Sequence, residues 1–466
     1  MKKIIKAYVS YIIIFIAVFI VYGTTINHSF TNWDDDINVL RNPYIQSISF
    51  NNLRYLFSHE FVGMYVPFTM LSYHFNILLS GYNPFSFLLL NIILHLINSI
   101  LVFKLANNFL KNPIYSLIVS LIFAVHPMNV EGVSWISARS NVLFSLFYLL
   151  ALLQYLNYRK TRKTKQLIYT LGLFLGSCFS KSAAVSFPLI IIAFDWYFDN
   201  SILIKKQLNK IPFLLISLLF GILTIYFRSK SNHLIDLSSI YSSVDRVFFV
   251  FYSFDFYLFK IFFPFDLNPF YIYPEKTNEL LPLIYYLSPL FLLIGGTVIF
   301  LNNKHKKDLI FIIVCYTSLV FLILKFIPVG NQIVADRYAY LPIAFLGIGI
   351  YKILENSINN KIIYIISTGI ILIFSFFSFN QNKIWENSIT LCDCMIEKNA
   401  NVALPYYNRA LAWADLGEYQ KAEIDFTSAI EYDSRTSFWA YMNRGNARKY
   451  LNNYKGAMQD YKTALS

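Results

Sequence analysis

Charged residues are scarce in this chain of 466 residues: only 14% are Asp, Glu, Lys or Arg, against about a quarter in soluble proteins. Glycine and proline number 16 and 15, which excludes a collagen-like or low-complexity chain. The four cysteines predict no disulfide or zinc framework, because Cys178 and Cys315 lie in apolar runs while Cys392 and Cys394 point to different faces of one predicted helix. A soluble or disulfide-built protein is therefore excluded.

Several enzyme motifs are also missing. The sequence has no phosphate-binding loop of the GxxxxGKS or GxxxxGKT type, no GxGxxG after a strand, no HExxH and no GxSxG. No soluble α/β domain is present that could bind a nucleotide sugar. If the protein handles a sugar donor, that donor must come from the membrane.

What the chain has instead is apolar and aromatic sequence. Hydrophobic residues make up 56% and aromatic residues 18%, which excludes intrinsic disorder, and the mean hydropathy is +0.50. Residues 381–466 contain ten basic and ten acidic residues, so the net charge of +13 belongs to residues 1–380. The excess is typical of lysines in loops beside anionic lipid and not of a nucleic-acid surface. We expect an integral membrane protein of the all-α class.

Apolar runs long enough to cross a bilayer recur through residues 1–380. A hydrocarbon core of about 30 Å requires about 20 residues of helix. The first run follows Met-Lys-Lys-Ile-Ile-Lys and has no Ala-x-Ala cleavage site before Gly23, so we expect a retained helix with its N-terminus in the cytoplasm. The sequence predicts about eleven spans: 4–22, 85–106, 113–127, 141–158, 166–180, 184–198, 211–228, 283–301, 309–327, 338–353 and 361–379.

Basic residues assign the sides of these spans. Cytoplasmic connections are rich in Lys and Arg, and counting residues 65–79 or 247–264 as a crossing would place a basic connection outside. Those two segments are therefore predicted as interfacial or re-entrant helices on the outer face, where the loop 23–64 and the region after residue 380 also lie. The basic connections contain Arg159, Lys160, Arg162, Lys163 and Lys165; Lys205, Lys206 and Lys210; and Lys304, Lys306 and Lys307.

An internal repeat occupies the C-terminal region. Asn408, Ala410, Tyr419, Ala422 and Ala429 recur 35 residues later as Asn443, Gly445, Tyr454, Ala457 and Ala464. This period, with small residues where two helices touch, is typical of tetratricopeptide repeats. We expect helical hairpins near 403–436 and 438–466, with a capping helix at 385–397. Less than two full repeats suggests a short or truncated array.

Ionisable residues at the outer face are the strongest functional signal, since charge near lipid is costly. The first group is Asn32-Trp33-Asp34-Asp35-Asp36 in the first outer loop. Adjacent carboxylates repel one another and raise at least one pKa, which suits a general base or a cation site. The alternative is a solvated acidic turn that caps a helix.

The second group follows the third predicted span: His126, Glu131, Trp135 and Arg139. Pro127 ends the helix, so these side chains fall in one short outer loop. Trp135 and Arg139 are expected on one helix face, and a structural salt bridge between Glu131 and Arg139 is the alternative to a functional role.

Two further groups carry cations at the outer side. Lys181 interrupts two apolar runs, and the stretch 331–342, NQIVADRYAYLP, contains Asp336 and Arg337. A single cation there could simply snorkel to the interface. Three cations from separate outer loops, Arg139, Lys181 and Arg337, predict a site for a lipid phosphate.

In these stretches the sequence resembles the transmembrane and tetratricopeptide-repeat O-mannosyltransferases and their bacterial relatives, which are multi-span glycosyltransferases of the GT-C class. The resemblance covers nearly the whole chain in order, ending with the repeats. It rests on WDDDINVLRNPYIQ, YVPFTMLSYHFN, GYNPFSFLLLNIILH, AVHPMNVEGVSWISARSNVL, FSKSAAVSFPLIIIAFDW and ADRYAYLP.

The resemblance implies a GT-C-like membrane domain, residues 1–380, followed by an extracytoplasmic repeat region, 381–466. It implies inverting transfer of a sugar, mannose being one candidate, from a polyprenyl-phosphate donor to a hydroxyl of a protein or glycan. Asp34 or Asp35 would be the base, with Glu131 and His126 orienting the acceptor or the sugar. Arg139, Lys181 and Arg337 would hold the phosphate, and Asp336 lies beside them.

Two features depart from the family pattern. Val66 stands where relatives often carry a basic residue before proline, and the repeat array is shorter than in animal proteins. The sequence predicts no protein-bound metal or cofactor and leaves the need for a divalent metal, the sugar, the acceptor and the oligomeric state open. Its composition suggests an AT-rich bacterial genome and hence the inner membrane. The alternative function is a non-catalytic membrane-anchored scaffold or a lipid-phosphate carrier.

Overall fold

The computed structural model describes residues 2–199, 208–230, 240–302, 304–326, 332–355, 357, 359–433 and 437–465. Lys205, Lys206, Asn331 and residues 434–436, which belong to the predicted basic connections, the last outer loop and the first repeat, lie outside the described residues.

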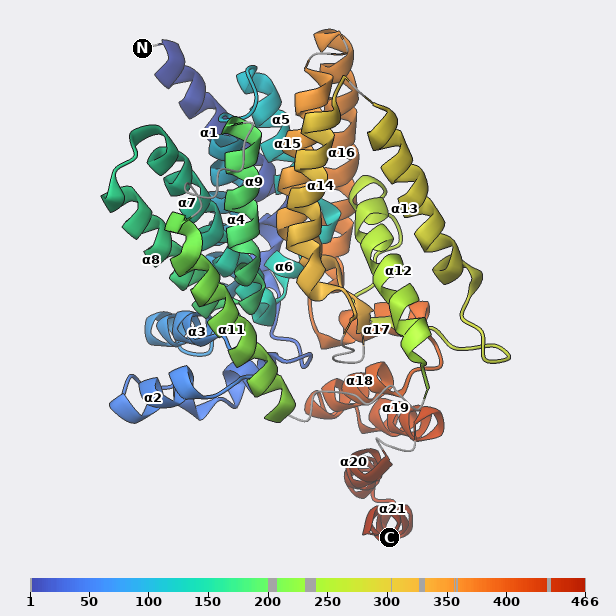
Figure 1. Cartoon of the computed structure of the whole chain (residues 1–466). Helices are drawn as coiled ribbons and strands as arrows, with labels where there is room; N and C mark the ends of the chain where they lie inside the picture. Colours follow the sequence, from blue (N-terminus) through green and yellow to red (C-terminus); the bar gives the residue numbers. More distant parts are fainter. Residues whose placement is uncertain are drawn as a thin grey trace.

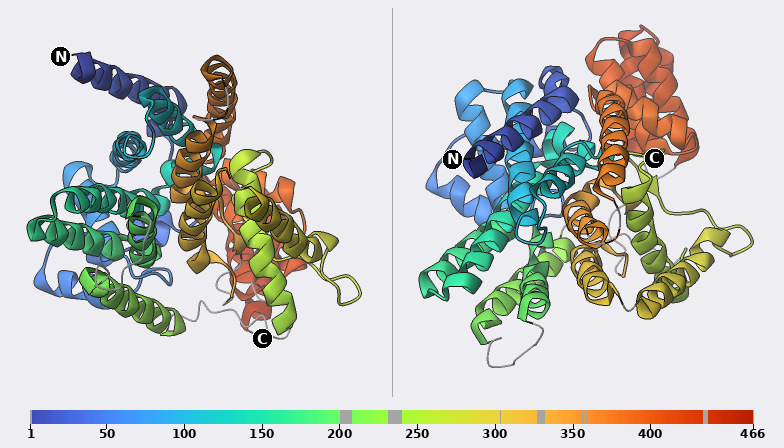
Figure 2. Two further views of the ribbon diagram at one scale, coloured as in Figure 1. Left: turned by 45° about the horizontal axis from the view of Figure 1, so that its top comes forward. Right: turned by 90° about the horizontal axis from the view of Figure 1, so that it is seen from above.

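Long helices form a bundle along one axis, and shorter helices collect at its lower end (Figure 1). Seen from above, α1 to α11 form one group and α12 to α16 a second (Figure 2). The long helices are α1 (Lys2–Tyr22), α4 (Pro84–Ala106), α5 (Pro113–Ala124), α7 (Arg139–Thr161), α8 (Thr164–Ser180), α9 (Phe187–Asp199), α11 (Ile211–Lys230), α12 (Ser243–Phe262), α13 (Leu283–Leu301), α14 (Lys306–Val320), α15 (Tyr340–Leu354) and α16 (Asn360–Ile384).

Each of the eleven predicted spans coincides with a helix, so the all-α membrane bundle is confirmed. Within the described residues, seven helices are long and apolar enough to cross a membrane, or eight if the bent pair Pro113–Ala124 and Pro127–Ser134 is one span. The others are short, with 17 residues in α8 and 15 each in α14 and α15. At 1.5 Å per residue these reach less than about 30 Å, so the full count of eleven crossings stays a prediction.

Polar side chains join the helices in the centre of the bundle. His95 of α4 bonds through Nε2 to the carbonyl of Ala124 (2.9 Å) and through Nδ1 to the hydroxyl of Tyr340 (2.7 Å). Asn98 donates to the carbonyl of Val142 (2.8 Å) in α7. Such bonds hold helices together where lipid removes the hydrophobic contribution to their association. They fix α4, α5, α7 and α15 as the frame that carries the outer loops.

The segments 65–79 and 247–264, predicted as interfacial or re-entrant helices, correspond to α3 (Pro67–Ser80) and α12. With α2 (Phe50–Ser58), α3 lies across the lower end of the bundle (Figure 1). In contrast, α12 runs beside α13 in both Figure 1 and Figure 2. The arrangement of α3 fits an interfacial helix, and the interfacial or re-entrant placement of α12 stays a prediction.

Short elements at the lower end complete the outer loops. Strand β1 (Tyr271–Ile272) pairs antiparallel with β2 (Gln332–Val334), which brings the loop after α12 beside the start of α15. The other short elements at this end are η1 (Gly23–Asn27), η2 (Asp36–Leu40), η3 (Pro43–Ile45), η4 (Pro127–Asn129), α6 (Val130–Ser134), η5 (Ile136–Ala138), η6 (Ser182–Ser186), η8 (Phe321–Ile323) and η9 (Asp336–Ala339). At the opposite end, η7 (Leu208–Lys210) leads into α11.

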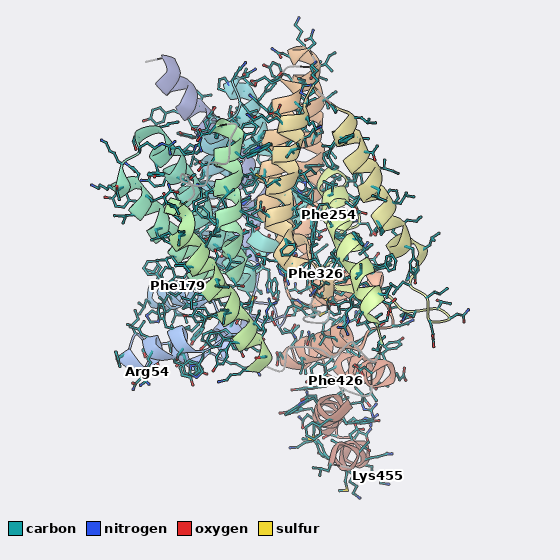
Figure 3. The ribbon with its side chains drawn as sticks, in the orientation of Figure 1. Arg54, Phe179, Phe254, Phe326, Phe426 and Lys455 are labelled. Atoms are coloured by element: carbon teal, nitrogen blue, oxygen red, sulfur yellow. The ribbon has the colours of Figure 1, made fainter. Side chains whose placement is uncertain are left out.

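The C-terminal region consists of α17 (Ser388–Lys398) and two helical hairpins, α18 (Ala403–Asp415) with α19 (Tyr419–Tyr432) and α20 (Ser437–Tyr450) with α21 (Tyr454–Leu465). The same bidentate ion pair occurs in both hairpins 35 residues apart: Arg409 with Asp425, and Arg444 with Asp460. Phe426 is fully buried in the first hairpin (Figure 3). The hairpins fit the predicted repeat, whose assignment to the tetratricopeptide class stays a prediction.

The basic connections and the predicted outer features lie at opposite ends of the bundle, as the positive-inside rule predicts. The N-terminus, the α7–α8 turn and the α13–α14 connection lie at the upper end in Figure 1, and α2, α3 and α17 to α21 lie at the lower end. The described basic connections therefore share one end with the N-terminus, and the predicted outer features share the other.

Candidate functional site

A cavity of about 770 Å³ lies at the lower end of the bundle. Its wall is built by the first outer loop, η9, the ends of α7, α8 and α11, and helix α18 of the first hairpin. The ionisable residues that line it are Asp34, Asp36, Arg41, Lys181, Arg228, Lys325, Arg337 and Asp415.

The first outer loop bends sharply at Asp34. Asp34 has φ of +124°, a strained conformation for any residue but glycine, and its carbonyl accepts the N–H of Asn38 (2.8 Å). The packing of the neighbouring residue stabilises this backbone conformation, because Trp33 packs edge-on against Phe270 with ring centroids 5.3 Å apart. Strained backbone of this kind concentrates at functional sites.

Of the two predicted base candidates, Asp34 and Asp35, Asp34 lines the cavity. Burial raises the pKa of Asp34 to about 7; Arg337 opposes this rise, whereas Asp35 and Asp36 add to it. In the described part of the chain, no hydrogen bond or ion pair engages its side chain. A carboxyl group with this pKa can take up a proton near neutral pH.

Asp35 points away from the cavity, which it does not line, and is 1% exposed. Its Oδ2 accepts the N–H (2.9 Å) and hydroxyl (3.0 Å) of Thr31, and its Oδ1 accepts the N–H (2.9 Å) and hydroxyl (2.6 Å) of Ser137. Asp35 therefore ties the first outer loop to the start of α7. It is buried and makes no side-chain capping bond at η2, so for Asp35 the alternative of a solvated turn that caps a helix is wrong.

Glu131 lies behind the cavity wall and orients Arg337. Its Oε2 accepts the backbone N–H of Arg337 (2.8 Å), and its Oε1 pairs with the guanidinium. Although burial acts to lower the pKa of Arg337, the charge of Glu131 outweighs it and raises that pKa above the usual range. Arg337 also lies over the rings of Trp135 and Tyr338, at 5.3 and 4.9 Å.

Arg139 is not part of this cavity. Its guanidinium is fully buried and donates to Asn91 (2.8 Å), Asn76 (2.6 Å) and the carbonyl of Phe87 (2.8 Å). Arg139 thus fixes α3 and α4 against α7. The predicted cluster of Arg139, Lys181 and Arg337 therefore does not include Arg139. The suggested salt bridge between Glu131 and Arg139 is wrong, because Glu131 pairs with Arg337.

The expected alignment of Trp135 with Arg139 on one helix face is also wrong. Trp135 has extended backbone between α6 and η5, and its ring stacks on that of Trp385 with centroids 5.3 Å apart. The guanidinium of Arg139 lies over Tyr73 instead, 4.5 Å from the ring centroid.

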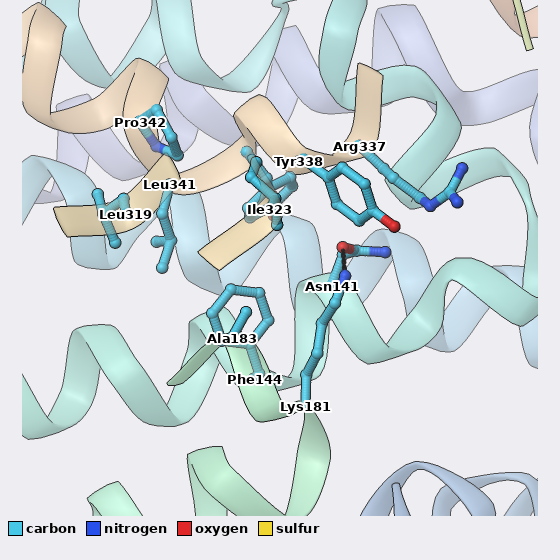
Figure 4. Close-up of a pocket in the computed structure, with 11 residues that line it drawn as sticks. Asn141, Phe144, Lys181, Ala183, Leu319, Ile323, Arg337, Tyr338, Leu341 and Pro342 are labelled. Atoms are coloured by element: carbon cyan, nitrogen blue, oxygen red, sulfur yellow. Dashed lines mark hydrogen bonds between the residues drawn. The ribbon is translucent and has the colours of Figure 1, made fainter. Parts of the chain in front are cut away.

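Lys181 stands beside Arg337 in the cavity. Its ammonium donates to Asn141 Oδ1 and lies 4.8 Å from the ring of Tyr338, and the three side chains converge in Figure 4. Burial lowers the pKa of Lys181 well below its usual range, and Arg337 and Arg228 add to this effect. An anion bound here would restore its charge. A small apolar pocket of about 20 Å³ lies beside them and is lined by Phe144, Leu319, Ile323, Leu341 and Pro342 (Figure 4).

His126 and Asp336 do not line the cavity but make hydrogen bonds behind its wall. His126 bonds through Nε2 to the carbonyl of Ile261 (2.9 Å) and accepts the N–H of Met128 at Nδ1 (3.2 Å), so both ring nitrogens are engaged. Asp336 accepts the hydroxyl of Tyr271 (3.0 Å). Burial raises the pKa of Asp336 well above its usual range, with Glu131 adding to the rise, which favours the neutral form.

The sequence analysis missed Arg41, Arg228 and Lys325 as cavity residues. Arg228 and Lys325 occupy the outer ends of predicted spans, where the positive-inside rule disfavours a cation just as it does at Lys181. The same signal would have found both. Among the residues that the structure describes, no group of three or more His, Cys, Asp or Glu side chains is arranged to hold a metal ion.

Comparisons with known proteins give several proteins named O-mannosyl-transferases and, over a short stretch, the translocon at the outer membrane of chloroplasts 64 of Pisum sativum, which is 41% identical over 85 residues, covering 18% of this chain and 14% of the relative. Human protein O-mannosyl-transferase TMTC3 is 26% identical over 474 residues, which cover 89% of this chain and 50% of that protein. Mouse protein O-mannosyl-transferase TMTC1 is 33% identical over 137 residues, covering 27% of this chain and 14% of the relative. This chain thus spans about half the length of TMTC3. No family profile matches the chain.

One solved structure aligns with most of the chain. The crystal structure of ArnT from Cupriavidus metallidurans bound to undecaprenyl phosphate matches over 97% of this chain and 75% of that one, with a TM-score of 0.40 and 12% identity. Over 89% of its length the chain is similar to human TMTC3, a protein O-mannosyl-transferase, so the resemblance noted in the sequence is confirmed.

Proposed function

We propose that this protein is a membrane glycosyltransferase that moves a sugar from a polyprenyl-phosphate donor to a hydroxyl acceptor at the outer face, with inversion. One observation carries the proposal: a carboxyl group with a pKa near 7, Asp34, shares a cavity with Lys181 and Arg337. That cavity contains both a base for a hydroxyl and cations for a phosphate. The similarity to proteins named O-mannosyl-transferases supports the choice and makes mannose the first sugar to test.

Asp34 acts as the base. As the acceptor oxygen forms its bond to the anomeric carbon, its proton passes to the Asp34 carboxylate. The bond between that carbon and the phosphate oxygen breaks on the opposite side, and its electron pair leaves with the polyprenyl phosphate. Attack opposite to the leaving group inverts the anomeric centre.

Lys181 and Arg337 hold the leaving phosphate. Its negative charge grows as the bond breaks, so cations placed there stabilise the transition state more than the bound donor. Arg337 is fixed by Glu131 and by two aromatic rings, which keeps the guanidinium in place before the donor arrives.

The other predicted site residues act by positioning. Asp35 holds the strained loop that presents Asp34, and Glu131 orients Arg337. His126 and Arg139 fix the helices behind the cavity. We place the cavity on the extracytoplasmic side, because the basic connections lie at the other end of the bundle. The composition of the sequence makes a bacterial inner membrane the first membrane to test.

The test is transfer by purified protein from polyprenyl-phosphate mannose, with and without added divalent metal. Asp34→Asn should lose transfer by about a hundredfold or more, since this is what a positioned base contributes. Glu397→Gln, which removes an exposed outer-side carboxylate of α17, is the matched control. If Asp34→Asn transfers sugar at the wild-type rate, the proposal fails and a membrane-anchored scaffold or lipid-phosphate carrier takes its place.

In cells, mass spectrometry of exported proteins and surface glycans with and without the gene identifies sugar and acceptor. Loss of a glycan in the strain that carries Asp34→Asn is the expected result. An unchanged set of glycans in that strain would show that the protein's role in the cell does not depend on catalysis by Asp34.

A further inference from the structure

Positive and negative charges lie on different parts of the cavity wall. Among the described residues that line it, the carboxylates come only from the first outer loop and α18: Asp34, Asp36 and Asp415. The ends of α8 and α11, the segment after η8 and the element η9 contribute only cations as charged lining residues: Lys181, Arg228, Lys325 and Arg337. The cavity therefore has a cationic part that is built by four separate segments of the chain.

The segments that carry these four cations pack against one another. The element η6, which begins directly after Lys181, packs against both α11 and η8. Arg337 and Arg228 repel Lys181. The same two guanidinium groups repel Lys325. The four positive charges therefore act on one another across one part of the cavity.

Aromatic rings lie beside Arg228 and Lys325. Phe227, next to Arg228 in the last turn of α11, stacks on Tyr65 with ring centroids 5.1 Å apart and planes 7° from parallel. The ammonium of Lys325 lies 5.9 Å from the ring centroid of Tyr273. These contacts place both cations before a ligand arrives, which reduces the entropy lost when it binds.

The donor proposed above brings little negative charge to this part of the cavity. A phosphate that links a sugar to a polyprenyl chain is a diester and carries one negative charge. Arg337 is paired with Glu131 behind the wall, and Lys181 matches the one charge of the diester. Arg228 and Lys325 add two positive charges to the same surface, and both would stabilise a further anion bound beside the donor phosphate.

We propose that Arg228 and Lys325 form a second anion site, which holds a phosphate group in addition to the donor phosphate at Lys181 and Arg337. The inference rests on the function proposed above for the position of the donor phosphate. The second phosphate belongs either to a diphosphate that joins lipid and sugar or to a separate phosphate-bearing molecule bound beside the donor.

The chemistry of this site favours phosphate over carboxylate. An arginine fork matches two oxygens of a phosphate, and lysine adds a compact charge beside it. A terminal phosphate carries close to two negative charges near neutral pH, whereas a carboxylate carries one. An acidic peptide is the poorer occupant, because it would also meet Asp34, Asp36 and Asp415 on the rest of the wall.

The experiment measures binding of farnesyl phosphate and farnesyl diphosphate to the purified full-length protein by titration calorimetry. The two probes have the same isoprenoid chain and differ by one phosphate. We expect wild type to bind the diphosphate about tenfold more tightly, because the second phosphate adds charge-assisted hydrogen bonds. Arg228→Gln and Lys325→Gln should each reduce this preference and leave the affinity for farnesyl phosphate nearly unchanged, whereas Lys181→Gln should weaken both probes.

Inorganic phosphate titrated into protein saturated with farnesyl phosphate distinguishes the two sources. Binding of phosphate beside farnesyl phosphate indicates a separate phosphate-bearing molecule. A preference for the diphosphate without such binding indicates a diphosphate-linked lipid. Either result supports the site only if Arg228→Gln and Lys325→Gln diminish it.

Matched controls remove exposed cations of the same two types elsewhere on the outer side. They are Arg54→Gln in α2 and Lys455→Gln in α21 (Figure 3), and both should bind every probe as wild type does. Equal affinity of wild type for the two farnesyl probes, with no phosphate bound beside farnesyl phosphate, overturns the second site. A diphosphate preference that survives both substitutions, or an equal loss of both probes in Arg228→Gln and Lys325→Gln, overturns it as well.

A separate measurement distinguishes this outcome from failure of the proposed function. Asp34→Asn should keep the affinities for both farnesyl probes while losing sugar transfer. If the second phosphate binds as expected but even the wild-type protein transfers no sugar, the transferase proposal fails while the second anion site stands.

Discussion

At the scale of single residues, Asp34 and Asp35 show how position separates two identical side chains. Asp35 has four hydrogen bonds and no access to the cavity, whereas Asp34 faces the cavity from a strained backbone. The sequence predicted that one of three adjacent carboxylates would have a raised pKa, but could not choose among them. The choice depends on Thr31 and Ser137, the second of which is 102 residues away along the chain.

The pKa of Asp34 predicts opposite effects of pH on rate and stability. The base form is needed for transfer, so the wild-type rate should rise with pH through about 7. Because burial raises the folded-state pKa of Asp34 above its unfolded value of 3.8, the stabilising contribution is present at low pH. It is lost as pH rises through about 7.

Thermal unfolding in detergent at several pH values tests the stability half of this prediction. Asp34→Asn lacks the titrating group and should be more stable than wild type at pH 8, by on the order of 1 kcal/mol after solvent screening is allowed for, with no gain below pH 4. A variant less stable than wild type at both pH values would mean that Asp34 is a structural carboxylate.

Asp35→Asn should lower the stability of the protein, in contrast to Asp34→Asn. The amide N–H₂ that replaces one oxygen would face the N–H and hydroxyl donors of Thr31 or Ser137, so we expect a loss of about 2–4 kcal/mol in stability. The yield of monodisperse protein and its melting temperature measure this. If Asp35→Asn folds as wild type and yet loses transfer, Asp35 acts in the chemistry as the resemblance implies.

At the scale of elements, hydropathy predicted the helices well because each apolar run must become a helix in lipid. The contacts between outer loops were not predictable in the same way. Glu131 and Arg337 are 206 residues apart, and Glu131 was paired with nearby Arg139 as the alternative. Arg139 instead satisfies the carbonyl and amide groups of α3 and α4. Sequence spacing indicates neighbours within one helix, whereas the pairing of loops depends on how the helices pack.

Lys181 and Arg337 line the cavity whereas Arg139 does not, which leads to a prediction for binding of the donor phosphate. Lys181→Ala and Arg337→Ala should each weaken binding of a polyprenyl-phosphate analogue, and their effects should be non-additive because both touch one phosphate. Arg337→Lys keeps the charge but loses the planar fork, so it should bind better than Arg337→Ala and worse than wild type.

Arg139→Lys is the contrasting variant for the same assay. It should lower stability, since buried bonds to Asn91, Asn76 and Phe87 are lost, while the folded fraction binds the analogue normally. Unchanged affinity in the Lys181 and Arg337 variants, or a selective loss of affinity in Arg139→Lys, would show that the phosphate lies elsewhere.

At the scale of the whole molecule, the cavity joins the membrane bundle to the helical hairpins. Asp34, Arg337 and Asp415 line one space although they come from the first outer loop, η9 and the end of α18. The division at residue 380, which the sequence placed at a change in composition, is therefore not a division of the site. The sequence suggests two parts because their compositions differ, whereas the structure joins them through Asn32 and Asn408.

The topology predicts which side of the membrane this shared site occupies. With the N-terminus in the cytoplasm and eleven crossings, Gln381 follows the last span on the outer side and Lys163 lies in a cytoplasmic turn. A reporter that is active only outside the cytoplasm should therefore work when fused after Gln381 and fail when fused after Lys163. The lower end of Figure 1 would then be the outer end. Since three of the helices are shorter than a typical span, a change in parity is the error that this experiment detects. Reporter activity after Lys163 but not after Gln381 would place Asp34 and the hairpins in the cytoplasm and exclude an exported protein or glycan as acceptor.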